Sequence, residues 1–378
     1  MSVSQQATTV AEKHAPTSAP QHAPRFHRLR VADVTRETDH AVSVAFEVPA
    51  ALAADYRFEP GQYLTLRTTI DGDDLRRSYS ICSGPKDGDL RVAIKRLEDG
   101  VFSNWVNETL KPGDEMEVMT PTGRFGLANA PGNGRIHVGF AAGSGITPIL
   151  SIMRGVLEME PDSHFFLFYG NRSTSDMLFR NDLEELKDRF LGRLAVFHVL
   201  SKEEQDISVL NGRLDGDKAR VLLTSMVPAQ MVDHVFICGP TGMIDDLEAT
   251  LQDIGIAGDR IHTERFVSVF NGRPRAPVQV APDAPPAHMA VLTVDGKRRE
   301  VPVAEAESIL DAALRAGMDL PFACKGGMCS TCRAHLTDGE APMEVNYSLE
   351  PWELKAGFIL TCQARPASER VVVDYDHV

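Results

Sequence analysis

The sequence predicts a multidomain protein, with an antiparallel β-barrel first, an α/β unit with a parallel sheet second and a small α+β unit last. Three observations lead to this fold class. The chain has 378 residues, too many for one ordinary core, so two or three domains are expected. Short strands give way near Gly134 to alternating strands and helices. A proline-rich stretch at residues 271–288 precedes the last unit.

Residues 26–128 contain short apolar strands separated by turn signals. The run from Tyr63 to Ile70 ends at Asp71 and Gly72, and Leu90 to Lys95 forms another such run. Strands of this length, spaced by roughly 8–12 residues, are typical of a small antiparallel barrel.

Residues 129–268 alternate between strands and helices. Such alternation indicates a parallel sheet with helices on both faces. Strands are expected at residues 135–141, 165–169, 194–200 and 235–238, with a helix at 181–189.

Closely spaced prolines in residues 269–288 disfavour helix and sheet and predict an extended linker. The unit at residues 289–378 opens with a hairpin that turns at Asp295 and Gly296. A helix follows, which Ser308 can cap and Gly317 can end.

Composition narrows the functional classes. Lys and Arg number 39 against 53 Asp and Glu, a formal charge of −14, which disfavours partners such as nucleic acid or an anionic membrane. No apolar span of about 20 residues is present. Residues 1–25 have no apolar segment and predict a disordered leader rather than a signal peptide. Without an export signal, we expect a reducing cytoplasm and read clustered cysteines as metal ligands.

Three cysteines in the last unit follow the spacing C-x4-C-x2-C, and a fourth lies further on. This is the plant-type spacing for a [2Fe-2S] cluster. Gly326 and Gly327 let the loop curl and turn amide N–H groups toward the sulfurs. The alternative is structural zinc, whose ligands usually come in two separate pairs. The candidate ligands are Cys324, Cys329, Cys332 and Cys362.

A [2Fe-2S] cluster accepts one electron at a time, so a nicotinamide donor would need a flavin between them. Arg77-Ser78-Tyr79-Ser80 on a barrel strand resembles the flavin motif of the ferredoxin–NADP⁺ reductase superfamily. The resemblance implies FAD, with Arg77 on the pyrophosphate, Tyr79 stacking on the ring and Ser80 near N5, and it counts Ser78 among the cofactor-binding residues. In the same way, the run from Gly100 to Ser103 matches the second phosphate contact of the family.

A glycine-rich turn follows the first strand of the α/β unit and opens a helix. It carries Gly143, Gly145, Thr147 and Pro148, a variant dinucleotide fingerprint in which proline replaces the third glycine. Glycines let the backbone approach a pyrophosphate, and the helix N-terminus favours its negative charge. Glycine-rich turns also occur for purely structural reasons.

Two further runs carry superfamily marks. Cys238-Gly239-Pro240 resembles the element that places a cysteine near the nicotinamide, although a lone cysteine is more often a buried small hydrophobe. The resemblance also implies that Glu264 and Phe266 lie near the flavin, and it makes Tyr79, Ser80, Cys238 and Glu264 the candidate catalytic residues. Cys82 has no catalytic role in this scheme and is expected to pack in the core.

Arg172 and Ser173 follow the second strand of the α/β unit. An arginine suits the 2′-phosphate of NADPH, whereas NAD sites often use an acidic residue at the ribose. We expect NADPH as the donor, with NADH as the alternative.

The order barrel, nucleotide unit, ferredoxin unit makes residues 26–378 similar to the reductase subunits of phenylacetyl-CoA 1,2-epoxidases. The similarity lies in residues 75–82, 141–148 and 323–329, and in Asn346 to Pro351, which belong to no cofactor loop. It implies a β-grasp fold for the last unit, NADPH as donor and a multisubunit diiron oxygenase as acceptor, in aerobic phenylacetate degradation. A Rieske or alkane-type oxygenase is the alternative acceptor, and a cluster-based redox sensor is the alternative function.

Overall fold

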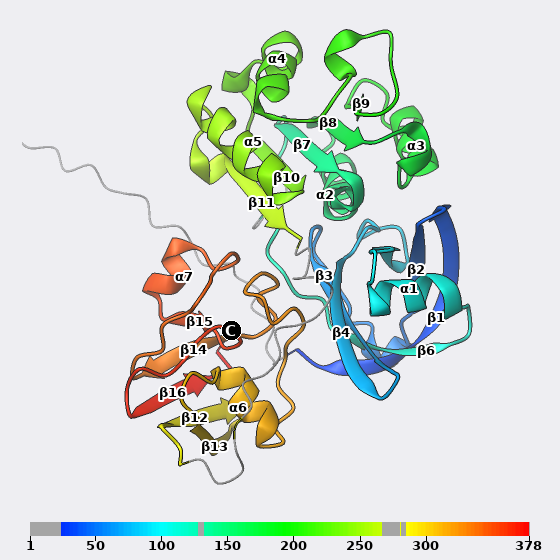
Figure 1. The fold of residues 1–378 in the computed structure, drawn as a ribbon. Helices are drawn as coiled ribbons and strands as arrows, with labels where there is room; N and C mark the ends of the chain where they lie inside the picture. The colour runs from blue at the N-terminus through cyan, green and yellow to red at the C-terminus, as the bar shows by residue number, and fades with distance from the viewer. Residues whose placement is uncertain (1–23, 128–131, 267–279, 281–284, 378) are drawn as a thin grey trace, which may run out of the picture.

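The computed structural model describes residues 24–127, 132–266, 280 and 285–377. The predicted leader and linker lie almost entirely outside this part of the chain. Within it, three units meet at one centre, with the α/β unit, the barrel and the α+β unit placed around it (Figure 1). Among the described helices, none is both long and apolar enough to cross a bilayer.

The first unit is a six-stranded antiparallel sheet in the order β4-β3-β6-β1-β2-β5. Just beyond β4, a bridge between Ile81 and Val92 of β5 connects the two edges of the sheet, so the predicted antiparallel barrel is confirmed. The core is filled by alternate strand residues such as Leu64, Leu66 and Val118, all 0% exposed. The elements are β1 Phe26–Thr38, β2 Ala41–Glu47, β3 Tyr63–Ile70, β4 Asp73–Ser80, β5 Leu90–Lys95, α1 Val101–Thr109 and β6 Glu115–Met119.

The second unit is a five-stranded sheet in the order β11-β10-β7-β8-β9, in which every pair is parallel. One hydrophobic cluster joins the sheet to α2 and α3, and another joins it to α4 and α5, so helices cover both faces as predicted. The elements are β7 Ile136–Ala142, α2 Ile146–Met159, β8 His164–Asn171, α3 Arg180–Arg189, β9 Leu194–Leu200, α4 Gly216–Met226, β10 His234–Gly239, α5 Thr241–Asp253 and β11 Ile261–Arg265.

The third unit is a mixed five-stranded sheet, β13-β12-β16-β14-β15, with its own core around α6. The expected hairpin turns at Asp295 and Gly296, both at positive φ, as a type I′ turn requires. The Ser308 hydroxyl caps α6 by accepting the Asp311 N–H, and Gly317 has a φ of +74°. The elements are β12 His288–Val294, β13 Lys297–Val303, α6 Ile309–Arg315, β14 Arg333–Asp338, α7 Pro351–Lys355, β15 Phe358–Leu360 and β16 Arg370–Asp374.

Short 3-10 turns join these elements. They span Ala50–Leu52, Gly143–Gly145, Thr174–Asp176, Ser208–Leu210, Ala229–Met231 and Gly258–Arg260.

Candidate functional site

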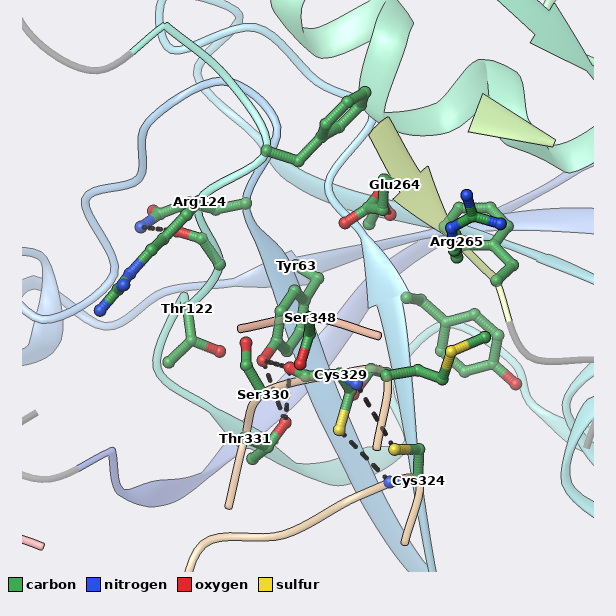
Figure 2. A pocket seen from close by; sticks show the side chains of 18 of the residues that line it. Tyr63, Thr122, Arg124, Glu264, Arg265, Cys324, Cys329, Ser330, Thr331 and Ser348 are labelled. Carbon is green, nitrogen blue, oxygen red and sulfur yellow. Dashed lines mark hydrogen bonds between the residues drawn. The ribbon is translucent and has the colours of Figure 1, made fainter. Parts of the chain in front are cut away.

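A cavity of about 2330 Å³ lies where the three units meet. It is larger than the roughly 300–1,000 Å³ of an ordinary small-molecule pocket, so it has room for extended ligands. Figure 2 shows part of its wall, formed by Tyr63 from the barrel, Glu264 from β11 and Cys329 from the third unit. The predicted site residues that line it are Arg77, Ser78, Tyr79, Ser80, Gly100, Ser103, Thr147, Glu264, Phe266, Cys324 and Cys329.

Strand β4 brings its four motif residues to this cavity. The Tyr79 ring lies 5.9 Å from Phe102 of α1 at a tilt of 31°, which leaves the ring part of the cavity wall. Arg77 donates from Nη1 to the Arg76 carbonyl at 2.8 Å, so this guanidinium is steadied at the wall by its own strand. A partly buried cation beside an aromatic ring suits the phosphate and ring ends of FAD.

Ser80 and Glu264 join the barrel to the nucleotide unit. The Ser80 hydroxyl donates to Glu264 Oε2 at 3.1 Å. Burial raises the pKa of Glu264 to about 8, and the Ser80 hydrogen bond opposes this shift only partly. Glu264 is therefore largely a neutral carboxylic acid at neutral pH, able to hold a proton at the cavity wall.

The turn before α1 uses its own hydroxyl. Ser103 Oγ accepts the Leu97 N–H at 3.1 Å and donates to the Gly100 carbonyl at 3.2 Å. A Cβ on Gly100 would lie only 2.5 Å from the Ser103 Oγ atom. The structure therefore gives Ser103 a role in holding the turn, and both residues remain at the cavity wall.

The glycine turn after β7 packs directly on the end of β10. A Cβ on Gly145 would lie 2.1 Å from the Cys238 carbonyl oxygen. Gly143 has a φ of +54°, and its carbonyl accepts the Tyr169 hydroxyl at 3.0 Å. The two nucleotide motifs therefore form one structural unit that only glycine at position 145 allows.

Several members of these nucleotide motifs lie behind the wall. Thr147 lines the cavity, and its hydroxyl donates to the Ser144 carbonyl at 3.0 Å. Cys238 is 0% exposed, and burial, followed by the nearby Glu264 carboxyl, raises the pKa of its thiol well above the usual range. The residues outside the lining are Gly143, Gly145, Pro148, Cys238, Gly239 and Pro240.

Arg172 and Ser173 lie beyond β8, also away from the cavity lining. Arg172 is exposed, while the Ser173 hydroxyl donates to Asp176 Oδ2 at 2.7 Å. Arg172, the residue expected to bind the 2′-phosphate of NADPH, is therefore followed by a serine that is hydrogen-bonded to the Asp176 carboxylate.

Backbone amides of the cysteine loop point at its sulfurs. Cys324 Sγ accepts from the Gly326 and Cys329 N–H groups at 3.3 and 3.4 Å, and Cys329 Sγ accepts from the Cys324 N–H at 3.4 Å. The Cys329 thiol, together with these amides, lowers the pKa of Cys324 to about 6. Gly327 has a φ of +76°, which the tight loop requires.

The four cysteines fall into two adjacent pairs. Cys324 interacts with Cys329, and Cys332 interacts with Cys362. Among the described residues, no group of three or more His, Cys, Asp and Glu side chains is arranged to hold one metal ion. Two thiol pairs supplied with amide N–H donors fit a cluster with two irons, each held by one pair.

Four residues outside the predicted motifs link the barrel to the third unit. Arg76, next to the flavin motif, donates to the Leu320 carbonyl at 3.2 Å and pairs with Asp319 at 3.0 Å. Side chains alternate between the two faces of a strand, so Arg76 lies on the face opposite Arg77. This alternation is the one sequence signal that could have identified Arg76 as a junction residue. The other three are Tyr63, Arg124 and Glu353.

Cys82 lies in the hydrophobic cluster that the barrel shares with α2, and its Sγ contacts the Arg91 carbonyl at 3.3 Å. This placement agrees with the packing role expected for it.

Three family models match the chain in the predicted order. They are an oxidoreductase FAD-binding domain at residues 29–126, an oxidoreductase NAD-binding domain at 140–249 and a 2Fe-2S iron-sulfur cluster binding domain at 292–367. The same order of units is found in phthalate dioxygenase reductase, a solved structure with a TM-score of 0.57 and 24% identity, covering 92% of this chain and 98% of that one. At this identity the likeness concerns the fold.

Two curated relatives match over nearly their whole length. One is a subunit of the 1,2-phenylacetyl-CoA epoxidase from Escherichia coli, which is 46% identical over 353 residues, 93% of this chain and 98% of that protein. The other is the ferredoxin reductase component of 3-ketosteroid-9-alpha-monooxygenase from Mycolicibacterium smegmatis. It is 36% identical over 357 residues, 92% of this chain and 96% of that protein.

Proposed function

The chain belongs to the oxygenase-reductase family that includes this 1,2-phenylacetyl-CoA epoxidase component, and on this premise we propose that it delivers electrons from NADPH to the oxygenase component of such an epoxidase. It is an NAD(P)H-dependent oxidoreductase with FAD-binding, NAD-binding and [2Fe-2S] domains. The acceptor in this proposal is a multisubunit diiron oxygenase that acts in aerobic phenylacetate degradation in the cytoplasm.

The observation that carries the proposal is the shared cavity. Tyr79 of the barrel, Glu264 of the nucleotide unit and Cys329 of the third unit all line it. Electron transfer between three carriers needs short separations, and one cavity bounded by all three units provides them. A protein that only sensed redox state through its cluster would not need the flavin motif, a wall from the nucleotide unit and the cysteine loop at the same cavity.

We propose the following assignment of residues to cofactors. FAD would be held by the β4 motif and the turn before α1, the nicotinamide nucleotide by the glycine turn and the end of β10, and the cluster by the four thiols. When bound, the flavin supplies the conversion of a hydride into single electrons, and the cluster relays those electrons one at a time. The catalytic residues in this assignment are Tyr79, Ser80, Cys238 and Glu264.

The chain's own groups prepare this site. Ser80 orients the Glu264 carboxyl by its hydrogen bond, and the carboxyl keeps its proton up to about pH 8. The Phe125 ring of the barrel packs edge-on against Phe236 of β10, and both rings are buried. The Cys238 carbonyl lies so close behind position 145 that only glycine fits there.

The choice between NADPH and NADH depends on the loop after β8. The exposed guanidinium of Arg172 supports NADPH, which we propose as the donor. The Ser173–Asp176 pair is the observation that favours NADH, because a carboxylate accepts a ribose hydroxyl and repels a phosphate. Arg172→Gln should raise the KM for NADPH about tenfold and leave that for NADH unchanged. An equal effect on both nucleotides would count for NADH as the natural donor.

The acceptor is tested by reconstitution. Purified epoxidase oxygenase should turn over phenylacetyl-CoA with this reductase and NADPH, whereas a Rieske-type oxygenase should not. Preferential coupling to the Rieske enzyme would favour the second candidate. The 36% identity to the reductase component of a ketosteroid monooxygenase supports an acceptor other than the epoxidase.

The internal path is tested by adding NADPH stepwise under argon and following the visible spectrum. Flavin and cluster bands should both bleach in the wild type. In Cys329→Ser the flavin should bleach at the normal rate while transfer to the cluster is lost. A wild-type cluster that stays oxidised while the flavin bleaches would refute the proposed path.

We also propose domain limits at residues 26–128, 129–268 and 289–378, joined by the 269–288 linker after a 1–25 leader. Limited proteolysis followed by mass spectrometry should cut first in the leader and the linker.

A further inference from the structure

Tyr63 connects the strand that pairs with the flavin motif to the cysteine loop. It is the first residue of β3 and lies opposite Ser80 of β4 in the sheet register. Its hydroxyl donates to the Cys329 carbonyl and lies 3.0 Å from Thr331 Oγ1 (Figure 2). One side chain thus reaches from the strand next to the flavin motif to the backbone of a proposed cluster ligand.

The barrel holds Tyr63 by its backbone as well as by its side chain. The Tyr63 backbone is already fixed by two hydrogen bonds with Thr122, at 2.8 and 3.1 Å. The ring is 6% exposed and Thr331 is 5% exposed, so the contact is sheltered from water, where a hydrogen bond is electrostatically stronger. The Cys329 carbonyl and the Thr331 hydroxyl both belong to the third unit, so these two hydrogen bonds act across the junction.

The Thr331 hydroxyl takes part in the same contact. With the Tyr63 O–H directed at Cys329, the Thr331 hydroxyl can donate to the phenol oxygen. The pair forms one small network across the junction.

We propose that Tyr63 is the positioning residue that holds the cysteine loop at β3, the strand paired with the flavin motif of β4, and thereby sets the rate of electron transfer from flavin to cluster. This inference rests on the proposed function. Tyr63 itself gains and loses no electron and no proton. One electron leaves the reduced flavin and reduces one iron of the cluster, and Tyr63 fixes the geometry in which this happens.

The test compares Tyr63→Phe with Tyr56→Phe in the full-length holoprotein. Tyr56 is a matched control, because its buried hydroxyl donates to the Val118 carbonyl at 2.6 Å and lies 3.2 Å from His27 Nδ1, both in the barrel. In rapid-mixing experiments with NADPH, both variants should reduce flavin at the wild-type rate. Tyr63→Phe should slow cluster reduction about three- to tenfold, the effect of one lost hydrogen bond, while Tyr56→Phe should not change it.

A second variant and a second readout separate positioning from general damage. Thr331→Val should slow the same step, and the double variant with Tyr63→Phe should be no slower than the worse single variant, because both remove one network. Hydrogen–deuterium exchange of residues 327–333 should increase in Tyr63→Phe and remain at the wild-type level in Tyr56→Phe.

The outcomes distinguish the two claims. A wild-type cluster that NADPH cannot reduce would refute the proposed function, whatever the variants do. A wild-type cluster reduced at the same rate as in Tyr63→Phe, with unchanged exchange in the loop, would refute the role of Tyr63 alone.

Discussion

The barrel meets its two neighbours through junctions of different chemistry. On the nucleotide side, Cys82, Ala93 and Phe125 of the barrel belong to the same hydrophobic cluster as Ile152 and Met153 of α2. Polar contacts add to it, such as the Ser151 hydroxyl on the Ser83 carbonyl at 2.8 Å. The barrel and the nucleotide unit therefore pack as one body with a common core.

The junction with the third unit is polar, and the two cores remain separate. Arg76, with a side chain 3% exposed, pairs with Asp319 and lies 4.2 Å from the Phe322 ring centroid. Arg124 pairs with Glu353, a carboxylate only 2% exposed.

The contrast shows how one chain can keep the nucleotide–flavin distance fixed and still let the distance between flavin and third unit change. Hydride transfer needs a fixed gap between nucleotide and flavin, which a shared core maintains. A junction made of ion pairs and hydrogen bonds can separate without exposing much apolar surface. A third unit that must also reach an oxygenase needs such a junction.

The largest expected effect on stability comes from shortening a side chain in the core that the barrel shares with the nucleotide unit. Ile152 is 1% exposed, and Ile152→Ala should lower the free energy of unfolding by about 2–5 kcal/mol through lost burial and a cavity. Because the core is common, flavin release and loss of nucleotide-unit structure should shift together in thermal unfolding.

The matched variant is Ile309→Ala in the core of the third unit, where Ile309 is 0% exposed. It should lower the temperature at which the cluster absorbance bleaches and leave flavin release in place. Separate transitions for the barrel and the nucleotide unit in Ile152→Ala would contradict the idea of a common core.

The next effect concerns the close approach inside the nucleotide unit. In Gly145→Ala the new Cβ would lie 2.1 Å from the Cys238 carbonyl oxygen, so the backbone must shift. We expect a loss of about 1–3 kcal/mol and a rise of at least about tenfold in the KM for NADPH. Gly242→Ala at the start of α5, where a Cβ meets nothing within 4 Å, is the control and should leave both quantities unchanged.

Local features of this fold were predictable from the sequence, because neighbouring residues determine them. Strands at Tyr63–Ile70 and Leu90–Lys95 were predicted to the residue, since each is bounded by turn signals. The cap at Ser308 and the turn at Asp295 depend on residues within a few positions of each other, and they were also predicted correctly.

The junctions were not predictable in this way. Tyr63 and Cys329 are 266 residues apart, and no periodicity relates them. Arg76 stands beside Arg77 of the flavin motif, and only the folded strand shows that the two arginines lie on opposite faces. The sequence motif likewise predicted that the Ser103 hydroxyl contacts a phosphate. In the structure this hydroxyl forms hydrogen bonds within its own turn.

A smaller effect comes from pH and should begin on the nucleotide side. Burial, followed by the nearby His262, His137 and Arg135, lowers the pKa of His234 to about 4, with Asp233 opposing. Burial also lowers the pKa of His137, although Glu160 opposes it. An unfolded histidine has a pKa near 6.5, so as the pH falls from 6.5 toward 4 the unfolded state takes up protons first and stability is lost.

With His234 partly open to solvent, this loss should be on the order of 1 kcal/mol at pH 5. Thermal unfolding at pH 7 and pH 5 measures it, and His234→Asn should reduce the difference between the two. Earlier loss of the cluster absorbance than of flavin binding at pH 5 would place the weakness in the third unit instead.

The smallest effect on stability should come from the polar junction, where it nevertheless changes function. The Arg124 side chain is 42% exposed, so Arg124→Gln should cost at most about 1 kcal/mol. Arg333 also pairs with Glu353 at 2.7 Å, so the buried carboxylate should keep a partner in this variant. The junction alone is weakened, and transfer from flavin to cluster should slow about two- to fivefold.

Ionic strength distinguishes this junction from the apolar one. In the wild type, salt should slow cluster reduction because it screens the Arg124–Glu353 pair, and Arg124→Gln should lose part of that dependence. Arg220→Gln, which removes an exposed pair with Asp253 inside the nucleotide unit, should leave both the rate and its salt dependence unchanged. If cluster reduction in the wild type were indifferent to salt, the junction would be held as firmly as the shared core, and the third unit would have no easy way to leave the flavin for a partner.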